Sequence, residues 1–340
     1  MLTKAYYLCK PLIPWVLRTG LRRARARYKR FSCAGTWPID EKAGAIPPGW
    51  PGWPQNKRFA VVLTHDVEGS KGFERIGRLA DLESGLGFRS SFNLVPEGEY
   101  RVSEATRLEL GRQGFEVGIH GLRHDGKLYW SHAAFSSQAE QIRQYRDQWG
   151  ASGFRSPFMH HNLEWIHELG MEYDASTFDT DPFEPQPDGV GTIFPFWVSD
   201  SNGSGYVELP YTLAQDYNLF VVLQERSTDV WMKKLDWIAA RGGMVLMNTH
   251  PDYMCFGGDK QRDEYPASWY SELLTHLTDR YAGQFWHALP RDVACFYRTL
   301  REKVQGSQAA PAGRAETIPD SVQHRLCRTN ACEASHEPMA

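Results

Sequence analysis

The sequence has few of the features that mark a secreted or a nucleic-acid-binding protein. Its six cysteines include no C-x-x-C pair and do not suggest a disulfide framework in a chain of 340 residues, so we expect free thiols and a cytoplasmic location. The net charge of −3 argues against a nucleic-acid partner, because proteins that bind nucleic acids are usually strongly basic. With 41% hydrophobic residues, the chain has enough apolar side chains for the core of a large domain.

The N-terminal region also lacks a membrane-spanning run and a secretory signal. Its apolar stretch, residues 5–17, is interrupted by Lys10, Pro11 and Pro14, and no small-residue cleavage site follows it. Residues 1–31 contain nine lysines and arginines but no acidic residue, with aromatic side chains among them. Two interpretations stay open. The segment either lies on the anionic inner face of a membrane, or is a basic segment that packs on the domain or is disordered.

Composition divides the chain into four parts. Residues 1–33 form the basic, aromatic N-terminal segment, and residues 34–56 form a linker rich in Pro, Gly and Trp. Residues 57–302 form the main domain. Residues 303–340 are rich in Ala, Pro, Gly and Ser without periodicity, which is typical of a disordered tail.

Apolar periodicity in the main domain alternates between the spacing of strands and that of helices. Strand-like runs lie at residues 59–63, 89–95, 117–119 and 244–247, and helical patterns at residues 73–86, 104–112, 135–149 and 229–241. Repeated units of this kind predict an α/β fold with a parallel sheet and helices outside it, most naturally a (β/α) barrel. In such barrels the active site lies at the C-terminal ends of the strands.

Two pairs of polar residues stand where strands are predicted to end. His120 and His124 follow one apolar run, and their spacing predicts a single turn of helix with both rings facing one ion. Asp66 and Glu68 follow another run and share one face of an extended chain. Two carboxylates at a strand end are costly unless something positive lies between them. Together the pairs favour a metal site over an acidic turn and chance histidines.

Four segments, in this order, resemble the motifs of the polysaccharide deacetylase superfamily, the NodB-homology or carbohydrate esterase family 4 group. They are Thr-His-Asp-Val-Glu-Gly at residues 64–69, His-Gly-Leu-Arg-His at 120–124, Arg-Ser-Pro-Phe at 155–158 and Leu-Met-Asn-Thr-His at 246–250. The resemblance implies a distorted parallel (β/α) barrel of the NodB-like type. It also implies a divalent ion, most naturally zinc, although cobalt, nickel and manganese accept similar ligands.

The acidic motif departs from the family pattern, because Val67 separates the two acids that are adjacent in the family. One alternative makes Asp66 the catalytic base and Glu68 the metal carboxylate, beside His120 and His124. The other places Asp66 itself on the metal. In both, the metal activates a water molecule for attack on the acetyl carbonyl.

The remaining motif residues receive their roles from the same pattern. His250 is expected to protonate the leaving group, and Arg155 to orient a site carboxylate through paired N–H groups. Phe158 replaces a tyrosine of the family, and Asp179 or Asp181 lies where the family lines its cleft, so these three are candidate substrate contacts. Asp179 or Asp181 would orient Arg155 or contact a sugar hydroxyl.

The expected function is removal of an N-acetyl or O-acetyl group from an amino sugar or glycan. An aromatic content of 13%, with 12 tryptophans, slightly favours a sugar substrate, because rings stack on sugar faces. Two alternatives keep the same barrel. One is a hydrolase of non-sugar amides or cyclic imides, and the other is a catalytically inactive barrel that binds glycan.

Overall fold

The computed structural model describes residues 15–258 and 260–309, so the expectations for residues 1–14 and 310–340 lie outside the described residues. The strands are β1 (Phe59–Val67), β2 (Ser91–Leu94), β3 (Glu116–His120), β4 (Gly153–Arg155), β5 (Tyr173–Asp174), β6 (Phe196–Ser199), β7 (Gly205–Glu208), β8 (Met244–Thr249), β9 (Met254–Cys255), β10 (Tyr265–Pro266) and β11 (Phe285–His287). The α-helices are α2 (Trp15–Ser32), α3 (Ser70–Gly85), α4 (Glu104–Arg112), α5 (His132–Trp149), α6 (Leu163–Ile166), α7 (Asp229–Arg241), α8 (Ala267–Tyr281) and α9 (Pro290–Ala309).

Strand β1 is the centre of a nine-stranded sheet, and among the described residues β9 and β10 form a separate two-stranded sheet. One side of β1 pairs with β8, and the other side pairs first with β11 and then with β2. Strands β3, β4, β5, β7 and β6 follow outward from β2, and every ladder in the sheet is parallel except that of β6 with β7. Among the described residues no ladder joins β6 or β7 to β8, so the barrel is open there. The predicted distorted parallel (β/α) barrel is confirmed.

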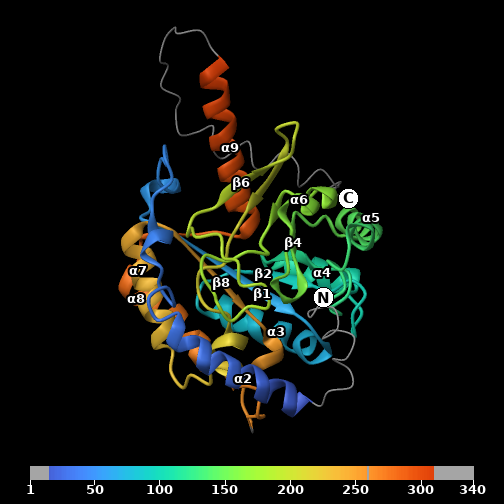
Figure 1. The fold of residues 1–340 in the computed structure, drawn as a ribbon, viewed down its shortest axis with the longest axis vertical. Helices are drawn as coiled ribbons and strands as arrows, with labels where there is room; N and C mark the ends of the chain where they lie inside the picture. Colours follow the sequence, from blue (N-terminus) through green and yellow to red (C-terminus); the bar gives the residue numbers. More distant parts are fainter. Residues whose placement is uncertain (1–14, 259, 310–340) are drawn as a thin grey trace, which may run out of the picture. The chain divides into compact units, whose positions relative to one another are not determined.

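The helices lie outside the sheet, as the alternating pattern predicted. Figure 1 shows α7 and α8 together on one flank, with α4 and α5 on the opposite flank. Helices α4 and α7 have the bounds that the sequence predicted, whereas α3 and α5 begin before the predicted starts at residues 73 and 135. Gly150 and Gly242 end α5 and α7 in the left-handed conformation, at φ +63° and +75°, which glycine adopts at low cost.

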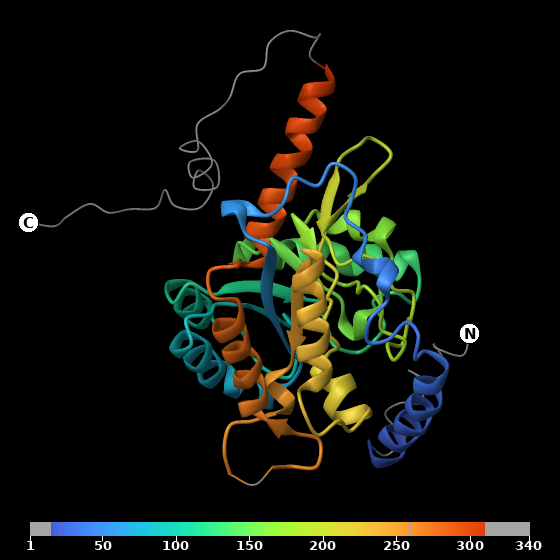
Figure 2. The same ribbon diagram turned by 90° about the vertical axis from the view of Figure 1, so that its left-hand side faces the viewer.

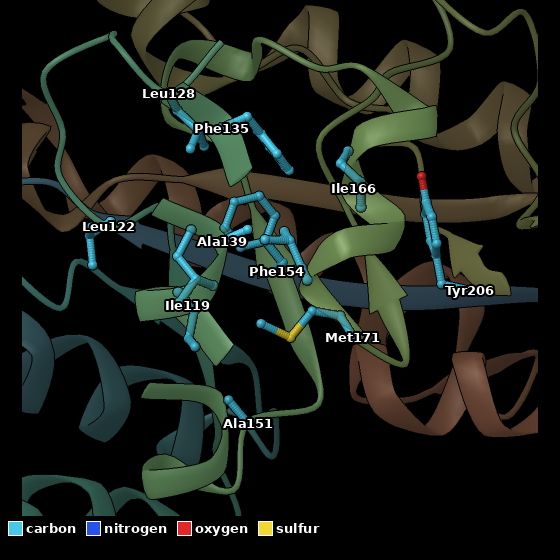
Figure 3. Close-up of a cluster of buried hydrophobic side chains, with 12 residues drawn as sticks. Ile119, Leu122, Leu128, Phe135, Ala139, Ala151, Phe154, Ile166, Met171 and Tyr206 are labelled. Atoms are coloured by element: carbon cyan, nitrogen blue, oxygen red, sulfur yellow. The ribbon is translucent and has the colours of Figure 1, made fainter. Parts of the chain in front are cut away.

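Strand β1 lies at the centre of the core. All nine of its residues are buried, which a parallel strand covered on both faces requires. A second apolar cluster lies between α5 and the sheet, with Phe154 of β4 near its middle and Ile119, Phe135 and Ile166 around it (Figure 3). These packed layers fix the strand ends on which the polar residues stand.

The segment between α2 and β1 packs on the barrel. Trp53 is buried and donates a hydrogen bond from Nε1 to the carbonyl of Gly242 at 2.7 Å. The carbonyl of Ala43 accepts a hydrogen bond from the amide of Ile193 at 3.1 Å. The chain forms a first compact unit that ends at Ala294 and a second that begins at Cys295. Helix α9 continues to Ala309, past residue 303, where the sequence predicted the start of a tail.

Cys33 and Cys255 are free thiols. Among the described helices, none combines the length and the apolar composition that crossing a bilayer would need.

Candidate active site

The predicted site residues stand together at the C-terminal edge of the sheet. Asp66 is the next-to-last residue of β1, His120 and Arg155 end β3 and β4, and His250 directly follows β8. Because the carboxyl ends of parallel strands meet at one edge, residues far apart in the chain lie close together there. A cleft of about 1140 Å³ opens at this edge. It is lined by Asp66, Glu68, His120, His124, Phe158 and His250, among others.

Glu68, His120 and His124 form a candidate metal centre. Each offers one ligand atom, and these atoms lie within 4.8 Å of one another. Nδ1 of His120 lies 3.1 Å from the carbonyl oxygen of Arg155, which fixes the ring and leaves Nε2 buried without a hydrogen-bond partner. Nε2 of His124 lies 3.0 Å from Oε1 of Glu68. A buried imidazole nitrogen with no partner is costly unless a cation or a donor reaches it, so this donor set fits a divalent metal.

The loop after β3 places His124 without the single turn of helix that the sequence predicted, so that prediction was wrong. Gly121 has φ +63°, and a Cβ at this position would lie 2.6 Å from Cγ of Pro157. The left-handed residue and the close approach of Pro157 turn the chain away from a helical path. The ring of His124 instead packs against Phe158, with ring centroids 4.3 Å apart.

Phe158 itself has a left-handed backbone, at φ 60°. Such a conformation is uncommon for a bulky residue, and strained residues of this kind cluster at functional sites. The turn directs the Phe158 ring to the cleft, where the sequence placed a substrate contact.

Asp66 is held by amide side chains rather than by the metal group. Its Oδ1 accepts a hydrogen bond from Nδ2 of Asn93, and its Oδ2 accepts one from Nδ2 of Asn248, each at 2.8 Å. Burial by itself would raise the pKa of Asp66, but the nearby His120, Arg155 and His250 hold it below its usual value. The carboxylate is therefore ionised at neutral pH.

Arg155 is completely buried beside this carboxylate. Its Nε lies 3.5 Å from Oδ1 of Asp66, and its Nη2 donates a hydrogen bond to Oγ1 of Thr64 at 3.0 Å. The sequence predicted a pair of N–H contacts to one carboxylate. Instead a single nitrogen approaches Asp66, while a second nitrogen is bound by the neighbouring threonine.

His250 is anchored by Asp216. Nδ1 of His250 lies 2.6 Å from Oδ1 of Asp216, whose Oδ2 also accepts a hydrogen bond from Tyr265 Oη at 3.0 Å. Burial would lower the pKa of His250, but Asp216, Glu68 and Asp66 together raise it to about 10. The ring is therefore a cation with Nε2 directed toward the two site carboxylates, at 4.0 Å from Asp66 and 3.9 Å from Glu68.

Asp252 ties the segment after His250 to the loop that carries Glu68. Its carboxylate accepts hydrogen bonds from the backbone amides of Glu68 at 3.0 Å, Gly69 at 2.9 Å and Gly72 at 3.2 Å. These amides lie at the start of α3, whose N-cap residue Gly69 has no side chain to accept from them. Tyr253 completes the link by donating to Oε2 of Glu68 at 2.9 Å.

Asp179 and Asp181 are not among the residues that line the cleft. Asp179 is buried and forms an ion pair with Nζ of Lys234 at 2.8 Å. Asp181 accepts hydrogen bonds from Tyr211 and Asn218. Among the described residues no hydrogen bond or ion pair joins either aspartate to Arg155, whereas Thr64 accepts a hydrogen bond from it.

Sequence reasoning missed four residues of the site: Asn93, Asp216, Asp252 and Tyr253. Asn93 had a weak signal, since it is a polar residue between Phe92 and Leu94 in a buried strand. Asp252 and Tyr253 lie two and three residues after His250, so their position near the site could have been predicted from the sequence. Asp216 belongs to no motif, and only the folded chain places it beside His250.

No family model matches this chain, and no curated protein matches it by sequence. Among solved structures, the chain is similar to a protein of Mycobacterium smegmatis assigned as a polysaccharide deacetylase, with 18% identity, a TM-score of 0.56 and coverage of 81% of this chain and 99% of that chain. It is similar to the PuuE allantoinase at 17% identity and a TM-score of 0.55, with coverage of 77% and 98%. The chain therefore has the distorted (β/α) barrel fold of the polysaccharide deacetylases, as a divergent example of it.

Proposed function

We propose that this chain is a metal-dependent hydrolase that removes an acetyl group from the nitrogen or oxygen of an amino sugar or glycan. The observation that carries the proposal is the position of Asp66 and His250. Each is anchored by its own partners, and both face the metal-ligand group of Glu68, His120 and His124. A carboxylate base and a cationic acid beside a metal centre suit the hydrolysis of an amide or ester.

The residues fit a divalent ion because two imidazoles and one carboxylate leave positions for water, as in catalytic zinc sites. Glu68, His120 and His124 would hold the ion, with Tyr253 orienting Glu68. An ion bound there supplies a Lewis acid that lowers the pKa of a water molecule and polarises a carbonyl oxygen. Because Asp66 is bound by two amides, we assign it the base role and assign the metal carboxylate to Glu68.

The chain's own residues provide the proton transfers. Asp66 accepts the proton of the attacking water, and the amides of Asn93 and Asn248 keep its carboxylate ionised and oriented. His250 donates a proton to the leaving amine or alkoxide from Nε2, since Asp216 occupies Nδ1. Arg155 positions Asp66 from the buried side.

The test is acetate release from N-acetylated glucosamine oligosaccharides by the zinc-loaded protein. We expect Asp66→Asn to lower turnover about a thousandfold, which is typical of a lost general base, while metal content stays at the parent level. Asp147→Asn, a change in an exposed ion pair with Arg146, serves as the matched control and should leave turnover unchanged. Equal turnover by Asp66→Asn and the parent would refute the assignment of the base.

A second candidate is hydrolysis of a non-sugar amide or cyclic imide on the same site. The observation that favours it is the similarity of the fold to an allantoinase, at a TM-score almost equal to that of the deacetylase. Allantoin and simple cyclic imides, tested beside the acetylated oligosaccharides, separate the two candidates. Metal-loaded protein that hydrolyses neither class would support the inactive glycan-binding barrel instead.

A further inference from the structure

Helix α2 carries an apolar stripe on the side that faces away from the domain. The stripe consists of Leu17, Leu21, Ala24, Tyr28 and Phe31, and its spacing of four, three, four and three residues places them on one helical face. Leu17 and Leu21 are 55% and 62% exposed, and Tyr28 and Phe31 are 81% and 88% exposed. Among the described residues, these are four of the seven large hydrophobic side chains that are exposed. Such a concentration on one helix marks an interaction site.

The opposite face of α2 holds the helix on the domain. Thr19 and Ala26 are buried there. Arg22 donates a hydrogen bond to Tyr217 Oη, and Arg23 donates one to the carbonyl of Val221, each at 3.0 Å. Figure 2 shows α2, in dark blue, beside the π-helical segment Tyr217–Val222. These contacts fix the rotation of α2, so the stripe is directed outward by the packing of the other face.

All the charged side chains of α2 itself are positive, although Arg23 pairs with Asp263 and Arg30 with Glu225 on the domain. Helix α2 contains seven arginines and lysines and no acidic residue. By helical spacing, Arg25 lies on one flank of the stripe and Arg27 on the other, and both are exposed. The side chain of Arg27 donates a hydrogen bond to Gln224. Because Gln224 is neutral, this contact does not neutralise the charge of Arg27. An apolar stripe between rows of arginine complements the acyl boundary and the phosphates of an anionic bilayer.

The stripe adjoins the mouth of the cleft. Arg22, Arg25 and Lys29 of α2 line the same cavity as Asp66 and His250. A surface that receives the stripe would therefore lie against the cleft opening. A substrate anchored in that surface would reach the site while its anchor stays in the surface.

We infer that α2 is an interfacial helix that docks the cleft mouth on an anionic phospholipid bilayer. The substrate is then an acetylated sugar carried on a lipid anchor, a statement that rests on the proposed function. The docking itself depends only on the stripe and its arginines.

The experiment is cosedimentation of the full chain with vesicles of phosphatidylcholine, with or without phosphatidylglycerol. We expect binding to the anionic vesicles, weakened by salt, and binding at least about tenfold weaker to phosphatidylcholine alone. Tyr28→Glu/Phe31→Glu should lose the binding, because it places two acids in the stripe. Ile46→Glu/Leu108→Glu is the matched control, because it changes two exposed apolar residues outside α2, and it should bind as the parent does.

Vesicle binding by Tyr28→Glu/Phe31→Glu equal to that of the parent would overturn the inference, as would a parent that ignores anionic vesicles. A parent that ignores vesicles but forms a dimer abolished by the same variant would assign the stripe to a second copy of the chain and overturn it too. The assay needs no turnover and should give the same result with His120→Ala. Release of acetate from soluble sugars without vesicle binding would therefore refute this inference alone, and vesicle binding without hydrolysis would refute only the proposed function.

Discussion

Asp216 holds His250 at two points, because its Oδ2 accepts a hydrogen bond from the backbone amide of His250 at 2.8 Å while its Oδ1 pairs with Nδ1 at 2.6 Å. The carboxylate thus fixes both the position of the strand end and the orientation of the ring. We call Asp216 a positioning residue, since it acts on the reaction through His250.

We predict that Asp216→Asn lowers kcat about 100-fold with a much smaller change in KM, because the ring loses its charged partner but the cleft keeps its shape. Metal content should stay at the parent level. The matched control is Asp236→Asn, which alters a similar aspartate–histidine pair with His276 outside the cleft. Loss of metal by Asp216→Asn would contradict a role confined to His250.

Removal of His120 should abolish metal binding and the stability that comes with it. We predict that the parent gains about 3 kcal/mol of unfolding free energy when zinc exceeds its dissociation constant about 100-fold, because the ion binds the folded chain only. His120→Ala should show no zinc-dependent rise in Tm. His132→Ala, which changes an exposed histidine near Glu168, should keep the full rise.

Asp252 couples a helix cap to the metal site. We predict that Asp252→Ala costs about 1 to 2 kcal/mol of stability, because the amides at the start of α3 lose their acceptor, and that zinc affinity also falls. Ser103→Ala removes the cap of α4, where Ser103 Oγ accepts from Thr106 N at 3.0 Å. This control should lose similar stability by denaturant unfolding and keep its zinc affinity. Equal zinc binding by both variants would show that the cap does not support Glu68.

The Asp179–Lys234 pair should matter for stability and not for substrate. Lys234→Ala leaves a buried carboxylate without its partner, so we predict a loss of about 3 to 5 kcal/mol in urea unfolding. Asp179→Leu/Lys234→Met removes both charges and should recover most of that loss. The double variant should keep the parent KM. A raised KM in the double variant would support the substrate contact that the sequence suggested.

The buried carboxyl group of Glu116 should make the folded chain less stable as pH rises. Its burial raises the pKa of the carboxyl group from 4.5 to about 7 in the folded chain, although Arg291 opposes the shift. Below pH 4.5 both the folded and the unfolded chain hold this proton. As pH rises toward 7 only the unfolded chain releases it, so about 3 kcal/mol of stability is lost across that window. In Glu116→Gln the slope of unfolding free energy against pH should be smaller there. The exposed Glu109→Gln should keep the parent slope.

The fold was predictable from the sequence because its signals are local. Each strand that ends in a site residue is a short apolar run, and the polar residue at its end stands out against that run. Asp66, His120 and His250 were found in this way. The bounds of α4 were predicted to the residue from its helical pattern, and in the structure Ser103 caps its start.

The supports of the site were not predictable because they come from distant parts of the chain. Asp216 and His250 are 34 residues apart, and Asp179 and Lys234 are 55 apart. No local sequence pattern predicts either pair. The helical turn at His124 was wrong for a local reason, because a spacing of four residues does not show that Gly121 adopts a left-handed conformation.

The hydrogen bond from Glu68 to Asp252 joins residues 184 positions apart, and β1 pairs along its length with β8. During synthesis, β1 is therefore made long before β8, with which it pairs, and before the turn at Asp252. An N-terminal fragment that ends between His124 and His250 holds the three metal-ligand candidates but lacks the proposed proton donor. The cleft is therefore complete only when residues close to both ends of the barrel segment are present together.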